Sequence, residues 1–279
     1  MRRTTSRDSL RFAKMKFGGT AGFSRVWQRN CPIIGLVLIF ALDTSSPCGS
    51  LAVLRDQNII GSVSTWTEEA YSSRIFRHLE FLLREVSLGL DAVDLFAVVA
   101  GPGSFTGLRV GLAAVKGWAE VYGKPIAAIS ALEAVAAQAR STAPVVIPVL
   151  DARRGQIYFG VYRRADDPDQ HRLVLEGDER VATPEEFVAE LHARNLNSGL
   201  VIATPAPEIV SSVMARRDGA GESAAAIPVD RVSAILAPHV GQLAYLRAQR
   251  GELTDALTLD ANYVRRSDAE MHLKGPRGS

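Results

Sequence analysis

An α/β protein made of two similar lobes is the fold class that this sequence of 279 residues predicts. A buried-type strand that ends in an aspartate and is followed by a returning strand occurs twice, with Asp43 and Asp151 in equivalent positions 108 residues apart. Between the two copies, the apolar run at residues 95–100 enters a glycine-rich turn and leaves it through a helical pattern. We therefore expect duplicated lobes of the βββαβα type.

The two hairpins are the best-defined elements. The first copy places a strand at residues 37–42 and its partner at 50–54, and the second copy places them at 145–150 and 156–162. The offset is the same for the aspartate and for both flanking strands. This agreement favours a duplicated unit over two unrelated turns of a common type.

Three segments are expected along the chain: a disordered basic tail at 1–36, an N-terminal lobe at 37–138, and a C-terminal lobe at 139–279 whose last helix returns to the first lobe. The tail holds eight Lys or Arg and one acid, so its formal charge is +7, whereas the whole chain carries +2. The remainder is thus mildly acidic, at −5, and has no bulk electrostatic footprint for nucleic acid. An import peptide is the alternative interpretation of the tail.

Composition excludes several classes of protein. Hydrophobic residues make up 47% and charged residues 22% of the chain, which is ordinary for a soluble globular protein. The apolar run at 32–42 is too short to span a bilayer, so no membrane association is expected. Cys31 and Cys48 are the only cysteines, which argues against a disulfide framework or a zinc cluster and fits the reducing cytoplasm.

The glycine-rich turn at 101–109 permits two interpretations. Glycine tolerates positive φ and allows close backbone approach, while Ser104 and Thr106 can cap the first turn of the next helix. Free amides at a helix N-terminus favour anions, so one interpretation is a phosphate cradle. The other is a plain corner between a strand and a helix.

Two amphipathic helices are expected beside this turn. Residues 71–90 form an apolar helical stripe with Ser72 or Ser73 available as the cap. Residues 106–122 place Gly107, Gly111 and Ala114 on one bare face, with Val110, Val115 and Trp118 nearby. A glycine inside a helix costs about 0.5 to 1 kcal/mol relative to alanine, so this face implies close packing. The packing partner is either the first helix or another protein.

The motifs together resemble those of a known superfamily and of one family within it. Paired hairpin lobes with a strand-end aspartate and a glycine-rich turn resemble the actin, sugar-kinase and Hsp70-like (ASKHA) superfamily. The motifs of the chain from residue 37 to about 269 resemble the TsaB (YeaZ) family. They are Ala41-Leu42-Asp43-Thr44-Ser45, Gly101 to Arg109, Lys116-Gly117, Ser130-Ala131-Leu132-Glu133, Asp151 to Tyr158 and Tyr263-Val264-Arg265-Arg266.

The resemblance implies a two-lobed ASKHA fold and a role in making threonylcarbamoyladenosine at position 37 of tRNAs that read ANN codons. It implies a non-catalytic subunit that dimerises with and activates the catalytic paralogue TsaD. The ATPase TsaE works with that pair, after TsaC has made threonylcarbamoyl-adenylate, and tRNA is engaged through the complex. A homodimer that uses the same patch is expected for the isolated protein.

Independent catalysis is not expected. The catalytic paralogue holds its metal with two histidines four residues apart plus a distant aspartate, and no two histidines of this chain have that spacing. After Asp151, the bulky residues Ala152-Arg153-Arg154 stand where a working ATPase needs a small loop to wrap phosphates. The alternative function is a stand-alone ATP-dependent ASKHA enzyme or a metallopeptidase-like relative.

The expected site residues form two groups, with no catalytic residue and no metal ligand among them. Nucleotide or phosphate contacts, with ATP or ADP at the partner interface, are expected from Asp43, Thr44, Ser45, Gly101, Gly103, Ser104 and Thr106. The partner interface is expected to include Tyr71, Arg74, Ile75, Gly107, Val110, Gly111, Ala114 and Trp118.

Two departures from the family pattern bear on these expectations. Tyr71-Ser72 and Arg77 stand where the first helix of the family usually carries a His-Ser/Thr pair and a later Pro, so the partner surface is expected to be specialised. Relatives begin with Met directly before the first strand, where this chain has Val37. A GTG start codon would be translated as Val, so residues 1–36 are alternatively an over-extended gene model. No motif is matched in residues 165–227, in which the low-complexity stretch 218–226 is expected to form a surface loop.

Overall fold

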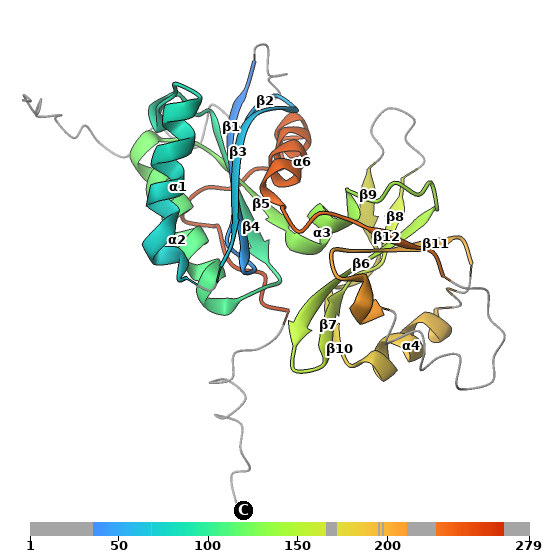
Figure 1. Ribbon diagram of the computed structural model, residues 1–279. Coiled ribbons are helices and arrows are strands. Elements are labelled where there is room, and N and C mark those ends of the chain that lie inside the picture. Colours follow the sequence, from blue (N-terminus) through green and yellow to red (C-terminus); the bar gives the residue numbers. More distant parts are fainter. Residues whose placement is uncertain are drawn as a thin grey trace, which may run out of the picture. The chain divides into compact units, whose positions relative to one another are not determined.

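The computed structural model describes residues 36–67, 69–165, 172–194, 196, 198–210 and 227–264 (Figure 1). The predictions for the basic tail, for a surface loop at 218–226 and for Arg265 and Arg266 lie outside the described residues. Two sheets organise the described part, and both sheets have the same strand order and sense.

The first sheet has the order β3-β2-β1-β4-β5. Its strands are β1 (Leu38–Asp43), β2 (Cys48–Arg55), β3 (Asn58–Trp66), β4 (Leu95–Gly101) and β5 (Ile126–Ser130). β2 runs antiparallel to both β1 and β3, whereas β1, β4 and β5 are parallel. The parallel strands are buried apolar runs, as strands covered on both faces require.

The second sheet repeats this plan in the order β10-β7-β6-β11-β12, with β8 and β9 added beside β6. β6 and β7 form the antiparallel hairpin, β10 extends it, and β11 and β12 continue in parallel with β6. The strands are β6 (Val145–Arg153), β7 (Gln156–Phe159), β8 (Tyr162–Arg164), β9 (Leu173–Leu175), β10 (Arg180–Ala182), β11 (Leu200–Thr204) and β12 (Val229–Arg231). The predicted duplication is confirmed, and the predicted strand at 156–162 is divided between β7 and β8.

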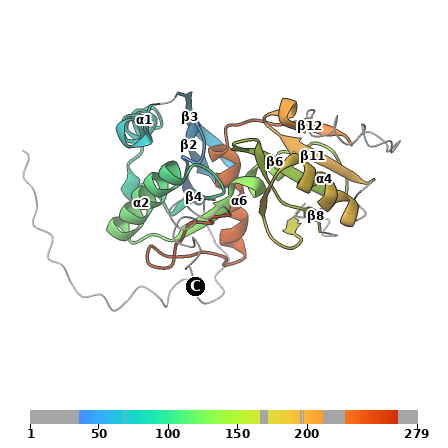
Figure 2. The same cartoon turned by 90° about the horizontal axis from the view of Figure 1, so that it is seen from below.

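Side-chain alternation along β1 assigns the helices of the first sheet to its two faces. Phe40 and Leu42 pack in one cluster with α1 (Tyr71–Glu85) and α2 (Phe105–Tyr122). Ile39 and Ala41 point the other way, into a cluster that contains α3 (Ala131–Ala136) and α6 (Ala237–Gln249). Figures 1 and 2 show α1 and α2 together on one side of the strands and α6 on the other.

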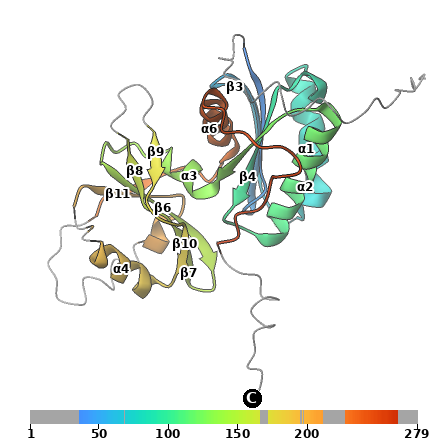
Figure 3. The same cartoon turned by 180° about the vertical axis from the view of Figure 1, so that it is seen from behind.

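The last described helix packs on the first sheet although it follows the second sheet in the chain. Leu54 lies against α6 at Gly241, where an added Cβ would come within 3.0 Å of the leucine side chain. The view from behind shows α6 beside the first sheet and α3 next to it (Figure 3). On the second sheet, α4 (Pro184–Ala193) buries Phe187 and Leu191.

Helix boundaries differ from the predictions at two places. The N-cap of α1 is Ala70, without a side-chain hydrogen bond, so the predicted cap by Ser72 or Ser73 is wrong. The helix ends at Glu85, and Ser87 has a φ of 53°, which stops the predicted continuation to residue 90. Ser104 caps α2 by accepting from the amide of Gly107, which confirms one of the two predicted caps. Among the described helices, none combines the length and apolar character that a bilayer crossing needs.

Candidate functional site

The turn after β1 places a buried carboxyl at the carboxyl end of the first sheet. Asp43 is fully buried, and its Oδ1 accepts hydrogen bonds from the Ser45 amide at 2.8 Å and the Ser45 hydroxyl at 2.7 Å. Oδ2 is buried without a hydrogen-bond partner among the described residues. Burial raises the pKa of Asp43 to about 6, against which the two Ser45 hydrogen bonds act in the opposite direction.

The same turn packs tightly against the first turns of α2. The Thr44 hydroxyl donates to the carbonyl oxygen of Gly107 at 2.8 Å. A Cβ added at Gly107 would come within 3.0 Å of the Thr44 carbonyl oxygen, and one added at Gly111 would come equally close to the Thr44 hydroxyl. The two glycines therefore allow α2 to approach the end of β1.

The glycine-rich turn is fixed by the rest of the chain. The Ser104 amide donates to the Ser45 carbonyl oxygen at 2.7 Å, and Gly103 lies directly against Ser45. Gly101 has a φ of 134° and faces the Asn262 carbonyl oxygen, where a Cβ would not fit. The two predicted phosphate loops thus pack on each other. Binding of a phosphate between them would require Ser45 and Ser104 to give up these contacts.

Of the predicted nucleotide group, the structure brings six members together and leaves one apart. Asp43, Thr44, Ser45, Gly101, Gly103 and Ser104 lie at one corner, and no described contact joins Thr106, on the first turn of α2, to them. The Ser45 amide and hydroxyl, the Thr44 hydroxyl and the Ser104 amide all donate hydrogen bonds within the chain, whereas Asp43 Oδ2 has no partner among the described residues. This geometry favours the strand-to-helix corner over the phosphate cradle.

The second hairpin presents a strained basic tip. Arg153, Arg154 and Gly155 have φ values of 62°, 57° and 71°, a backbone that arginine adopts rarely. Asp151 accepts from the Arg153 amide at 2.7 Å, and Arg153 pairs with Gln156 across the turn. The tip is therefore a two-residue turn with exposed arginines.

Four of the eight predicted interface residues are buried inside the chain, and this corrects the prediction for them. Gly107 and Gly111 are buried against Thr44 in the turn after β1. Arg74 and Ile75 are each 1% exposed. Arg74 stacks on the Tyr71 ring, 4.1 Å from its centroid, and donates to the Thr65 hydroxyl at 2.7 Å.

The other predicted interface residues are half-buried. Trp118 packs edge-on against Phe40 with ring centroids 5.5 Å apart, and Ala114 lies beside the same core. The Tyr71 hydroxyl donates to the Ser46 carbonyl oxygen, which closes the β1–β2 turn from the side of α1. Val110 is partly exposed and lies toward the outside of α2.

The outward side of α1 and α2 carries apolar and small residues, most of which the sequence analysis missed; Val110 is the one that it named. Phe76 is 59% exposed and Val121 is 75% exposed. Gly117, on the outside of α2, has no heavy atom within 4 Å of an added Cβ. We call Phe76, Val110, Ala113, Gly117 and Val121 the outer helical face. The 3.6-residue period of α2 was the available signal, because it places Gly117 opposite the buried side.

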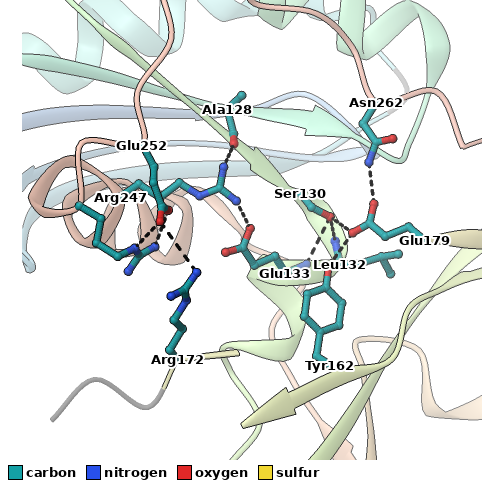
Figure 4. A network of polar contacts seen from close by, with 11 residues as sticks. Ala128, Ser130, Leu132, Glu133, Tyr162, Arg172, Glu179, Arg247, Glu252 and Asn262 are labelled. Carbon is teal, nitrogen blue, oxygen red and sulfur yellow. Dashed lines mark hydrogen bonds and ion pairs between the residues drawn. The ribbon is translucent and has the colours of Figure 1, made fainter. Parts of the chain in front are cut away.

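A second polar cluster was also missed by the sequence analysis (Figure 4). Glu179 accepts from the Ser130 hydroxyl, from the Tyr162 hydroxyl at 2.6 Å and from the Asn262 amide at 2.6 Å. Burial raises the pKa of Glu179, and these three hydrogen bonds oppose that effect. The four residues of this cluster come from four separate segments, so no local sequence motif could predict it.

The described part of the chain contains no group of three or more His, Cys, Asp or Glu residues that could bind a metal ion. His239 is buried, and burial lowers its pKa, while His78 lies on α1 near Arg74 and Arg77. Neither histidine belongs to a cluster.

The two matching sheets define the class of protein. Each sheet consists of an antiparallel hairpin unit followed by two parallel strands, and the helices α3 and α6 belong to the core cluster that includes residues of both sheets. Together with the aspartate at the end of β1, this is the two-lobed ASKHA fold that the sequence predicted. Solved structures agree with this assignment.

The chain is similar to two solved structures from Pseudomonas aeruginosa, one described as YeaZ and one as an uncharacterized protein with similarity to peptidase YeaZ. The first is 26% identical, with a TM-score of 0.64 over 81% of this chain and 99% of that one. The second is 26% identical, with a TM-score of 0.65 over 82% of this chain and 100% of that one. A family model described as TsaD, tRNA N6-adenosine threonylcarbamoyltransferase, matches residues 56–173.

Curated relatives are named tRNA threonylcarbamoyladenosine biosynthesis protein TsaB. The Haemophilus influenzae protein is 33% identical over 166 residues, which cover 56% of this chain and 69% of the relative. The Bacillus subtilis protein is 33% identical over 144 residues, which cover 50% of this chain and 63% of the relative. The match therefore spans somewhat less than two thirds of the length of that relative. The chain belongs to the TsaB (YeaZ) family.

Proposed function

We propose that this protein is the non-catalytic partner subunit of a tRNA threonylcarbamoyladenosine synthase, and that it dimerises with and activates a TsaD-like catalytic paralogue. Family membership supports the pathway. The observation that supports a partner role is the outer helical face, where apolar residues and an open glycine lie exposed on two neighbouring helices. We also propose a cytoplasmic location and lobes that span 37–138 and 139–279.

The outer helical face has the properties of a helix-packing surface. Exposed Val121 supplies apolar area one turn from Gly117 on α2, where a second backbone can approach closely, and exposed Phe76 adds apolar area on α1. A paralogue of the same fold carries equivalent helices, so the two pairs can meet about a pseudo-two-fold axis as four helices. A stable interface of this kind buries about 1,600 Å² in total.

Within the proposed complex, the catalytic chemistry belongs to the paralogue. A TsaE-like ATPase and tRNA would join through the complex, and ATP or ADP would bind at the interface between the two paralogues. For this chain, the proposal assigns a structural role to the Asp43 corner. It fixes the end of β1 to the first turns of α2 and so positions the outer helical face.

The direct test is reconstitution. The chain is mixed with a TsaD-like protein and a TsaE-like protein from the same source, threonylcarbamoyl-adenylate and unmodified tRNA, and modified tRNA is quantified by mass spectrometry. We expect co-purification of the two paralogues and modification that depends on this chain. Robust ATP hydrolysis by the isolated chain, abolished by Asp43→Ala, would instead favour a stand-alone ASKHA enzyme.

A further inference from the structure

A cavity of about 570 Å³ lies apart from the Asp43 corner and the outer helical face, and the Glu179 cluster forms part of its lining. Its walls come from β9, from the C-terminal end of α6 and the turn after it, and from the segment that holds Asn262. None of the predicted nucleotide residues lines it. The close-up shows Arg172, Arg247 and Glu252 gathered at one end and Glu179 at the other (Figure 4).

At the arginine end of the cavity, the Glu252 carboxylate lies between Arg250 and Arg172, in a position where an anionic ligand could bind. Arg250 donates from Nε and Nη2 to the two Glu252 carboxylate oxygens, both at 2.9 Å. Arg172 Nη2 lies 3.9 Å from Glu252 Oε1 on the other side. The Arg250 hydrogen bonds lower the pKa of Glu252, and the charges of Arg250, Arg172 and Arg247 add to the effect. The position therefore fits a carboxylate and carries positive potential.

Glu252 is a replaceable occupant of this position. Its side chain is 43% exposed and follows Gly251, which has a φ of 71° and no heavy atom within 4 Å of an added Cβ. Solvent-exposed ion pairs contribute little to stability, so an incoming anion can displace Glu252 at small cost. Among the described residues, the only ion pair of Arg172 is the long one to Glu252.

The opposite end of the cavity, at Glu179, is lined by carboxylates that can accept hydrogen bonds. Glu179 is largely buried and is held by three neutral donors, with Asp178 exposed beside it on the same wall. Glu133 contributes a carboxylate that Arg247 already binds at 2.5 Å. A wholly anionic ligand would be repelled at this end, whereas hydroxyl or amino groups would find acceptors.

We propose that this cavity binds a small molecule that carries a phosphate or carboxylate group at one end and hydrogen-bond donors at the other. The anionic group takes the place of the Glu252 carboxylate between Arg172 and Arg250, where guanidinium groups can bind it in bidentate fashion. The donor groups point toward Glu179 and Asp178. This site is separate from the outer helical face and does not depend on a protein partner.

The test measures anion binding to the isolated full chain by isothermal titration calorimetry at constant ionic strength. Inorganic pyrophosphate probes the phosphate source, and citrate probes the carboxylate source. Glu252→Gln should tighten binding of at least one of them about tenfold, because the internal competitor is neutralised, and Arg172→Gln should weaken it about tenfold. Circular dichroism establishes that each variant is folded, and Arg172→Lys, which keeps the charge, should bind more tightly than Arg172→Gln.

Glu80→Gln is the matched control, because Glu80 forms an exposed ion pair with Arg84 at 2.7 Å on α1, outside the cavity. This variant should bind both probes like the wild-type chain. Binding of one probe alone identifies the anionic group that the site prefers. The proposal is wrong if folded Glu252→Gln protein shows no saturable binding of either anion at about 10 mM. It is equally wrong if Glu252→Gln changes the affinity no more than Glu80→Gln does.

Discussion

Gly111→Ala should destabilise the isolated protein, although the same change stabilises most helices. In an exposed helix interior, replacing glycine by alanine gains about 1 kcal/mol. At Gly111, however, the new Cβ would come within 3.0 Å of the Thr44 hydroxyl, and that hydroxyl donates to the Gly107 carbonyl oxygen at 2.8 Å. Overpacking costs about 1 to 3 kcal/mol, and loss of the buried hydrogen bond costs about 1 to 3 kcal/mol more. The net expectation is a loss of about 1 to 5 kcal/mol.

Gly117→Ala is the control for this experiment, since an added Cβ there meets no heavy atom within 4 Å. It should raise the free energy of unfolding by about 0.5 to 1 kcal/mol, as measured by urea denaturation. Thr44→Ala should lessen the penalty of Gly111→Ala, which a double-mutant cycle would detect as coupling. Equal effects of the two glycine substitutions would refute the close packing of α2 on the end of β1.

Two further predictions concern the pH dependence and a helix cap. Because the native Asp43 carboxyl has a pKa of about 6 while the unfolded chain releases that proton near 3.8, the native state binds the proton more tightly, and stability falls as pH rises through this window. The free energy of unfolding should fall by about 3 kcal/mol between pH 4 and pH 7. Urea denaturation across this range measures the fall, and Asp43→Asn should remove it. If Asp43→Asn leaves the pH dependence of the unfolding free energy unchanged, other groups cause it. Thr183→Ala removes the capping box that Thr183 forms with Glu186 at α4 and should cost about 1 kcal/mol in thermal melting, whereas an unaltered melting temperature would show that the cap is dispensable.

The sequence predicted the parts of the fold that local periodicity and turn chemistry determine. The hairpin at Asp43, its copy at Asp151, the buried strand β4 and the Ser104 cap all follow from short-range patterns. Which neighbour a helix face of small residues packs against depends on the tertiary structure and not on local sequence. The spacing of Gly107 and Gly111 predicted close packing, but nothing local identified Thr44 as the neighbour.

The same limit explains what was missed at the sites. Glu179 meets Ser130, Tyr162 and Asn262 only because the fold brings four distant segments together, the last of them 83 residues away. The predicted phosphate cradle stays a prediction, but a related point bears on it. Amide groups that are free in an isolated turn find partners when a second turn, here at Ser45, packs against them.

The affinity of this chain for a TsaD-like paralogue, measured with a charge placed on the outer helical face, tests the central claim most directly. Val121→Arg puts a cation on α2 where the wild-type side chain is 75% exposed, so folding should be unaffected. Val229→Arg on β12, where the valine is 40% exposed, serves as the control in the other sheet. We predict that Val121→Arg weakens binding at least tenfold, at an unchanged melting temperature, while Val229→Arg binds like the wild type. Wild-type affinity for Val121→Arg, or no binding of the paralogue by the unmodified chain, would contradict the proposed role.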